Sequence, residues 1–354
     1  MGEKDDYYKH VAFNHDSTRF VCACNDGVEV YDCDPLKLAF GRNPKLAKGL
    51  AIAEMEDNLR LFLLGGGKFP LDDNKRVVIW DEVQGRISSN SYNCASQVLA
   101  IKVSGDAVAI VMQNKVELHV YVKANETSRI YRSVTTCNLR GVCALSPGYV
   151  LAIPGLSEGE VRIHAAHRHP FSINAHANTL SCLALSQNGR FLATASIKGT
   201  VVKIYSISTG WGEKLQELRR GKDKAEIWSM AFSPDNHWLA LTSDKCTIHV
   251  FKVNVPDSST TSNSSAASNH EVTATNPTSS LSFMRGVLPS YFSSQWSFAQ
   301  FQLKTKSHAV VTFSSKEPYT ILVACRNSTF YKLKFDPAFG GTMKQEKYCI
   351  FPEV

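Results

Sequence analysis

LALSQNG at residues 183–189, FLATAS at 191–196 and VVKIY at 201–205 form the stretch of sequence that decides the fold. Apolar residues alternate with small or polar ones in each run, and turn-forming residues such as Asn188 and Gly189 separate the runs. A period of two places successive side chains on opposite faces of an extended chain. The stretch therefore predicts three consecutive strands joined by two turns.

The same three-strand pattern returns along the chain. Clear copies lie at residues 11–31 and 230–251, and weaker copies lie at 50–81, 98–122, 142–164 and 308–335. When about thirty residues of a Ser/Thr-rich tract, described below, are left out of the count, the seven units have a mean length near the roughly 40–45 residues of a WD-type repeat. We therefore predict an all-β fold, a seven-bladed β-propeller of four-stranded blades that forms a single domain over residues 1–354.

Composition agrees with a folded chain that has an anionic partner. Of 354 residues, 44% are hydrophobic and 20% are charged, which excludes global disorder. The net charge of +7 suits phospholipid head groups, nucleic acid or acidic proteins and does not choose among them. No apolar run has the length of a membrane span, and residues 1–10 do not resemble a secretory signal. We expect a cytoplasmic protein whose ten cysteines are reduced.

One segment does not fit the repeat. Residues 254–282 contain nine Ser and five Thr, with Asp257 and Glu271 as the only charges. Such a stretch buries too little to order itself, so we predict a long disordered loop after the sixth unit, inserted in blade six and extending over 254–286. Its end can form a short amphipathic turn of helix, which can dock back on the propeller, through Leu281, Phe283, Met284, Val287 and Leu288.

The segment Leu218-Arg219-Arg220-Gly221 lies between the fifth and sixth units. Adjacent side chains on an extended segment point to opposite sides, so we expect one surface arginine to face each unit. Each unit offers a hydroxyl-rich turn, SIKGT at 196–200 and SDKCT at 243–247. A guanidinium, an ammonium and two hydroxyls can hold a phosphate monoester, which predicts two adjacent cradles. The alternative is a solvated arginine pair without a ligand.

No other motif indicates catalysis or metal binding. Gly65-Gly66-Gly67-Lys68 lacks the spacing of a phosphate-binding loop, and His164, His167 and His169 lack further ligands at zinc spacing. No nucleophile–base set stands out. We therefore expect no enzymatic activity, no cofactor and no metal site.

These motifs together resemble the PROPPIN family, also called WIPI proteins, which are seven-bladed phosphoinositide-binding propellers. The hallmark is the Arg-Arg-Gly motif at 219–221 after an aromatic residue or leucine, here Leu218. Further anchors occur in order at 31–36 (YDCDPL), 65–67 (GGG), 78–81 (VIWD), 193–196 (ATAS) and 288–298 (LPSYFSSQWSF). Leu218 and the 291–298 run are most similar to the WIPI three and four branch.

The resemblance implies binding of phosphatidylinositol 3-phosphate and phosphatidylinositol 3,5-bisphosphate, and a role in autophagosome formation. Carried over by position, one pocket comprises His176, Ser196, Lys198, Thr200 and Arg219. The other comprises Arg220, Ser243, Lys245, Thr247 and His249. The loop after Lys252 is implied to touch the membrane, so the protein is expected to be recruited peripherally to preautophagosomal and endosomal membranes.

A protein partner is expected on the opposite edge, at the turn that contains Asn14 and Asp16 in blade one. The resemblance implies that these residues bind an autophagy lipid-transfer protein, whereas turn capping by their own side chains is the alternative. We predict a monomer with no nucleic-acid partner. A generic WD-repeat scaffold without lipid binding and a nucleic-acid binder remain the competing hypotheses.

Overall fold

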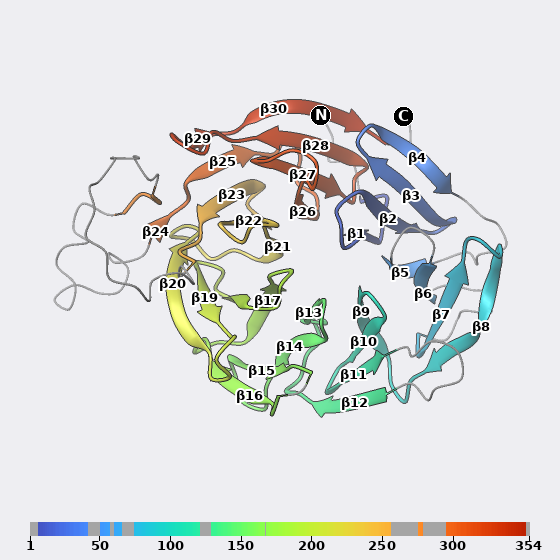
Figure 1. The fold of residues 1–354 in the computed structure, drawn as a ribbon. Coiled ribbons are helices and arrows are strands. Elements are labelled where there is room, and N and C mark those ends of the chain that lie inside the picture. Colours follow the sequence, from blue (N-terminus) through green and yellow to red (C-terminus); the bar gives the residue numbers. More distant parts are fainter. Residues whose placement is uncertain are drawn as a thin grey trace, which may run out of the picture.

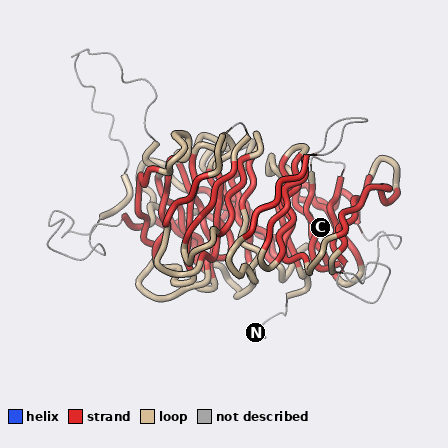
Figure 2. Tube along the Cα trace, turned by 90° about the horizontal axis from the view of Figure 1, so that it is seen from below, coloured by secondary structure: helices blue, strands red, loops and turns tan. Residues whose placement is uncertain are grey.

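The computed structural model describes residues 6–41, 50–56, 60–65, 74–120, 129–166, 168–255, 275–278 and 295–351. Within these ranges the fold is all-β, and seven sheets are arranged radially around a central axis (Figure 1). The side view shows the strands between two faces formed by loops (Figure 2). The predicted seven-bladed propeller is confirmed. The described ranges include no helix with the length and apolarity needed to cross a bilayer.

Each blade takes its strands in chain order from the axis outward. Blade one comprises β1 (His10–Phe13), β2 (Arg19–Cys24), β3 (Gly27–Cys33) and β4 (Leu36–Gly41). Blade two comprises β5 (Leu50–Met55), β6 (Arg60–Gly65), β7 (Arg76–Asp81) and β8 (Arg86–Asn93). Blade three comprises β9 (Val98–Ser104), β10 (Ala107–Met112), β11 (Lys115–Val120) and β12 (Arg129–Val134). Blade four comprises β13 (Ala144–Ser146), β14 (Val150–Pro154), β15 (Glu160–His164) and β16 (Phe171–Asn174).

Two of the remaining three blades carry a fifth strand. Blade five comprises β17 (Leu180–Leu185), β18 (Phe191–Ser196), β19 (Val201–Ser206), β20 (Glu213–Arg219) and β24 (Gln295–Trp296). Blade six comprises β21 (Ile227–Phe232), β22 (Trp238–Ser243), β23 (Thr247–Lys252), β25 (Ala299–Gln302) and β29 (Gly341–Thr342). Blade seven comprises β26 (Ala309–Phe313), β27 (Thr320–Cys325), β28 (Thr329–Lys334) and β30 (Lys344–Ile350).

The hydrophobic core lies between neighbouring blades. Every residue of β18 and of β22 is buried, because a blade covers each face of these second strands. One apolar cluster joins the fifth and sixth blades, from Phe191 and Ala193 to Leu239 and Phe251. Blades five and six are therefore held together as one packed unit, and this fixes the turns at their ends relative to each other.

The Ser/Thr-rich segment interrupts blade six before its fourth strand. Since β25 pairs with β23 and follows residue 298, the insertion lies between the third and fourth strands, which confirms the predicted insertion in blade six. Only residues 254, 255 and 275–278 of the tract are described. Asn276 is 6% exposed, and its Oδ1 accepts a hydrogen bond from Lys252 N at 2.7 Å. These residues contact the blade, which Ser/Thr-rich composition does not predict.

Candidate anion-binding site at blades five and six

The turns that join the second and third strands of blades five and six have the same backbone geometry. Gly199 N donates to Ser196 O at 2.8 Å, and Cys246 N donates to Ser243 O at 3.0 Å. Gly199 and Cys246 occupy the left-handed region, with φ of 59° and 58°. The two turns therefore present serine, lysine and threonine at equivalent positions, as the sequence predicted.

The segment 220–226 connects the two turns. Arg220 N donates to Thr200 O at 3.0 Å, and Ala225 N donates to Lys198 O at 3.1 Å. At the far end, Glu226 O accepts a hydrogen bond from Asp244 N at 3.0 Å. Backbone hydrogen bonds thus fix the segment after Arg219 to both turns, so the predicted pockets share one wall.

Both arginines are buried, although we expected them at the surface. Arg219 is 6% exposed and Arg220 is 7% exposed. Arg219 ends β20, and β24 pairs in parallel with this outer strand so that Arg219 lies opposite Trp296. Residue 296 is far from residue 219 in the chain, and for this reason the local pattern did not predict the cover.

The Arg220 guanidinium donates hydrogen bonds to backbone carbonyls and does not extend freely into blade six. Its Nε donates to Gly199 O at 3.0 Å, and its Nη2 donates to Asp223 O. Burial lowers the pKa of Arg220, while Asp244 and Asp223 act in the opposite direction. The assignment of Arg220 to the sixth-blade pocket stays a prediction, because its hydrogen bonds reach the fifth-blade turn while its charge acts on His249 of blade six.

His249 is buried and His176 is half-buried, and the pKa of each is lowered. His249 is 6% exposed, and burial followed by the nearby Arg220 charge lowers its pKa to about 4. His176 Nε2 lies 2.9 Å from Thr194 Oγ1, and burial followed by the Lys203 charge lowers its pKa to about 4. The structure therefore brings His249 close to Arg220, as predicted for the second pocket.

The remaining predicted residues lie on the turns. Lys198 and Lys245 are exposed, Thr200 and Thr247 are half-buried, and Ser196 and Ser243 are buried. Thr247 Oγ1 donates to Gln302 Oε1 at 2.8 Å, which adds a side chain from β25 that the sequence did not single out. Asp244 also lies at this turn, where its Oδ1 accepts from Glu226 N at 2.9 Å.

The blade-one residues have turn-capping contacts. Asn14 is 4% exposed, and its Oδ1 accepts a hydrogen bond from Arg19 N at 2.9 Å. Asp16 is exposed, and its Oδ1 accepts from Thr18 N at 3.0 Å. The capping alternative thus describes both side chains in the isolated chain, and only Asp16 is open to a partner.

The candidate membrane-inserting residues Leu281, Phe283, Met284, Val287 and Leu288 lie outside the described residues.

Comparison with known proteins gives the family. The PROPPIN family model matches residues 75–348. Autophagy-related protein 18e of Arabidopsis thaliana is 32% identical over 350 residues, which cover 96% of this chain and 87% of that protein. SVP1-like protein 2 of Pichia angusta is 31% identical and covers 85% of this chain, with 82% of that protein matched.

Solved structures show the same fold. Kluyveromyces lactis Hsv2 superposes with a TM-score of 0.73 at 19% identity, covering 97% of this chain and 98% of that chain. KlAtg21, solved in complex with the coiled coil of AgAtg16, gives a TM-score of 0.70 at 17% identity and covers 97% and 99%. The matching family model and these relatives, together with the duplicated turn of blades five and six, show that the chain belongs to the PROPPIN family of phosphoinositide-binding β-propellers.

Proposed function

We propose that this chain is a non-enzymatic phosphoinositide effector that binds phosphatidylinositol 3-phosphate and phosphatidylinositol 3,5-bisphosphate through two pockets. The observation that supports this most is the duplicated turn, with the 220–226 segment hydrogen-bonded to both copies. Each copy presents an exposed ammonium and a half-buried hydroxyl, from Lys198 and Thr200 or from Lys245 and Thr247. An ammonium and a hydroxyl suit a phosphate monoester.

Arg220 acts in this proposal by position and charge. Its guanidinium joins Gly199 O to Asp223 O, so it keeps the shared wall between the pockets in place. Its buried positive charge also makes the site favourable for an anion. A neutral His249 imidazole has one N–H that can donate to a phosphate oxygen, whereas His176 Nε2 lies 3.2 Å from Thr194 O and holds that backbone instead.

Two pockets on one rigid body bind a membrane bivalently. Once one head group is bound, the second engagement is intramolecular, and avidity can exceed single-site affinity by about 10²–10⁴. The segment with Leu281, Phe283, Met284, Val287 and Leu288 supplies a second, apolar signal in this proposal.

Changing Phe283 and Met284 to Ser should weaken vesicle binding and spare soluble head-group binding. Equal loss of vesicle binding and of soluble head-group binding would contradict this role.

The proposed output is recruitment of an autophagy lipid-transfer protein to preautophagosomal and endosomal membranes. The solved KlAtg21 complex holds a coiled-coil protein partner, which supports protein recruitment by propellers of this shape. Blade one lies apart from blades five and six around the ring (Figure 1), so one molecule can hold membrane and partner together. In the blade-one turn that follows β1, the exposed Asp16 is the candidate contact for the protein partner.

Vesicle flotation tests the lipid proposal. The chain should float with vesicles that contain phosphatidylinositol 3-phosphate or the 3,5-bisphosphate, and should stay in the bottom fraction with unphosphorylated phosphatidylinositol at matched charge from phosphatidylserine. Flotation that depends only on total negative charge would overturn the head-group proposal. Absence of flotation would favour a generic WD-repeat scaffold, and salt-sensitive binding to RNA or DNA without lipid binding would favour a nucleic-acid binder.

A further inference from the structure

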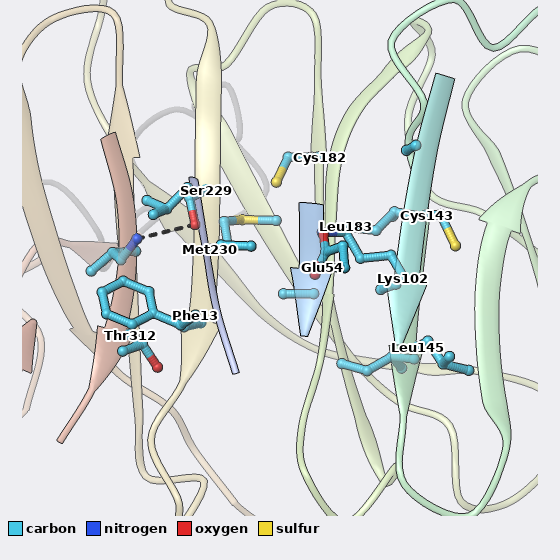
Figure 3. A pocket seen from close by; sticks show the side chains of 18 of the residues that line it. Phe13, Glu54, Lys102, Cys143, Leu145, Cys182, Leu183, Ser229, Met230 and Thr312 are labelled. Carbon is cyan, nitrogen blue, oxygen red and sulfur yellow. Dashed lines mark hydrogen bonds and ion pairs between the residues drawn. The ribbon is translucent and has the colours of Figure 1, made fainter. Parts of the chain in front are cut away.

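The ring encloses a polar cavity on its axis, away from the two rim pockets. Its volume is about 480 Å³, and the inner strands of all seven blades contribute to its lining. Figure 3 shows side chains from several blades pointing into this space, with Glu54 and Lys102 near its centre. The volume lies within the roughly 300–1,000 Å³ typical of small-molecule sites.

Two blades place charges where the other five place small side chains. The corresponding position of the inner strand carries Ala or Thr in five blades, as Ala12, Ala144, Ala184, Ala231 and Thr312. In blades two and three the same position carries Glu54 and Lys102, and Lys102 Nζ donates to Glu54 Oε1. The Glu54 side chain is 7% exposed and that of Lys102 is 38% exposed, so Lys102 is the more exposed side chain of the pair. A buried ion pair contributes little net stability, and stability alone does not account for it.

Further nitrogen groups surround this pair. His10 Nε2 lies 3.8 Å from Glu54 Oε1, and the charges of Lys102, Arg326 and His308 all act on His10. His308 stacks on Trp228 with ring centroids 5.1 Å apart, and the Arg326 charge acts on it. His10, Lys102, His308 and Arg326 therefore form one cluster, which we call the axial cluster.

Several polar atoms of the cavity wall have no protein partner. Within the described ranges these are His10 Nδ1, His308 Nδ1, Arg326 Nε, Ser104 Oγ and Ser181 Oγ, each fully covered. Buried polar groups are normally hydrogen-bonded, and leaving one unpaired costs about 1–3 kcal/mol. Because each of these atoms is fully covered, a ligand in the cavity reaches it only after the covering side chains move.

The cavity carries excess positive charge. Its charged lining comprises Lys102, Arg140 and Arg326 against Glu54 alone. Lys102 pairs with Glu54 and Arg140 pairs with Glu226, so the excess positive charge of the lining is at Arg326, on which Asp6 acts from outside the lining. Burial and these cations hold the pKa of His10 well below its usual range, and burial followed by Arg326 lowers that of His308 to about 3. Both imidazoles are neutral at pH 7 and can take up a proton when a negative charge arrives.

We propose that the axial cluster binds a phosphate-class anion, with Arg326 and Lys102 providing charge and His10 and His308 providing N–H donors. Orthophosphate and the phosphate groups of a soluble inositol phosphate share this chemistry. A planar guanidinium and an ammonium that line the same cavity suit the tetrahedral oxygens of a phosphate. The proposal is independent of the rim pockets, because the two sites share no residue.

Calorimetry on a rim-defective chain tests the proposal. The exposed or half-buried rim residues are changed together, as Lys198→Gln, Thr200→Val, Lys245→Gln and Thr247→Val, and the chain is titrated with orthophosphate at low ionic strength. One saturable site per chain is expected. Adding Arg326→Met should weaken it at least tenfold, whereas the matched control Arg190→Met, on an exposed turn of blade five, should leave it unchanged. Absence of saturable binding, or equal effects of the two variants, would overturn the proposal.

Histidine NMR covers the case in which Arg326→Met does not fold. In the rim-defective chain, the ring signals of His10 and His308, assigned with His10→Gln and His308→Gln, should shift on adding orthophosphate and titrate at higher pH. Signals that do not move would overturn the proposal. Soluble inositol 1,4,5-trisphosphate separates the sources: tighter binding than orthophosphate identifies an inositol phosphate as the natural occupant, and tighter orthophosphate binding identifies free phosphate.

Discussion

At the scale of single residues, the Arg220 guanidinium adds to the backbone hydrogen bonds that join the blade-five turn to the 220–226 segment. It donates to Gly199 O in the blade-five turn and to Asp223 O in the following loop. Removing the guanidinium leaves these carbonyls without their donor. A hydrogen bond from a charged group contributes about 1.5–3 kcal/mol.

Arg220→Met is therefore expected to lower the free energy of unfolding by about 2 kcal/mol and to weaken head-group binding. Urea unfolding followed by circular dichroism measures the first effect. The control is Arg190→Met, which removes an exposed arginine from the same blade. Equal stability of the two variants would show that Arg220 is a solvated side chain with no structural role.

His249 gives the folded chain a predictable response to acid. Its pKa is about 4 in the folded state, against 6.5 for an ordinary histidine, because it is buried beside Arg220. As pH falls through 6.5, His249 becomes protonated in the unfolded chain but stays neutral in the folded chain. This contribution to stability is therefore complete above about pH 6.5 and is lost as pH falls towards 4.

His249→Gln should remove this part of the pH dependence, which amounts to about 3 kcal/mol between pH 6.5 and 4. Denaturant midpoints measured across that range check it. His237→Gln, at an exposed position of the same blade, should keep the native slope. If both variants keep that slope, His249 is protonated in the fold and the described burial is wrong.

At the scale of elements, the two turns are matched in conformation but differ in what surrounds them. A Cβ at Gly199 would fall 1.9 Å from Ala225 O, and φ there is positive. Cys246 adopts nearly the same φ with a side chain in place. The blade-five turn therefore requires glycine at position 199, because both the positive φ and the lack of space exclude a side chain. The blade-six turn accommodates a side chain at position 246.

Gly199→Ala should cost about 2 kcal/mol or more, because it adds a steric overlap to an unfavourable φ. It should also displace segment 220–226 and reduce head-group binding in both pockets. Cys246→Gly should stay within about 1 kcal/mol of the native protein. Thermal unfolding of the two variants compares them; the reverse order of stability would contradict the described turns.

Sequence analysis located the second and third strands of the blades more readily than the fourth. The second strands β18 and β22 are covered on both faces, so their apolar runs are continuous. The outer strands β20 (EKLQELR) and β30 (KQEKYCI) face solvent and carry charged residues, which hide the strand pattern. The insertion in blade six was predicted, but the strand pattern did not identify β25 as the strand that continues the sheet after the tract.

The candidate site was predictable where its contacts are local. The serine, lysine and threonine of each turn follow from a short repeated pattern, and the structure places them at equivalent positions. Burial of Arg219 and Arg220 was not predictable, because it depends on β24 and on how the 220–226 segment folds back. Asn14 shows a third case: its sequence context allowed two roles, and only the described contacts identify the capping one.

At the scale of the whole molecule, the proposed partner contact at blade one can be separated from membrane binding. Asp16→Arg should abolish pull-down of the lipid-transfer partner and leave vesicle flotation unchanged. Asp16→Asn keeps an oxygen that can accept from Thr18 N and so tests charge without removing the cap. Asp26→Arg, another exposed position of blade one, is the control. Normal pull-down with Asp16→Arg would place the interface elsewhere.

The central claim is that one rigid ring holds two separate head-group pockets, and the stoichiometry of soluble phosphatidylinositol 3-phosphate measured by calorimetry tests it most directly. The native chain should bind two short-chain molecules. Lys198→Gln with Thr200→Val should leave one, Lys245→Gln with Thr247→Val should leave one, and all four changes together should leave none. A native stoichiometry of one, or complete loss in either two-residue variant, would contradict two independent pockets.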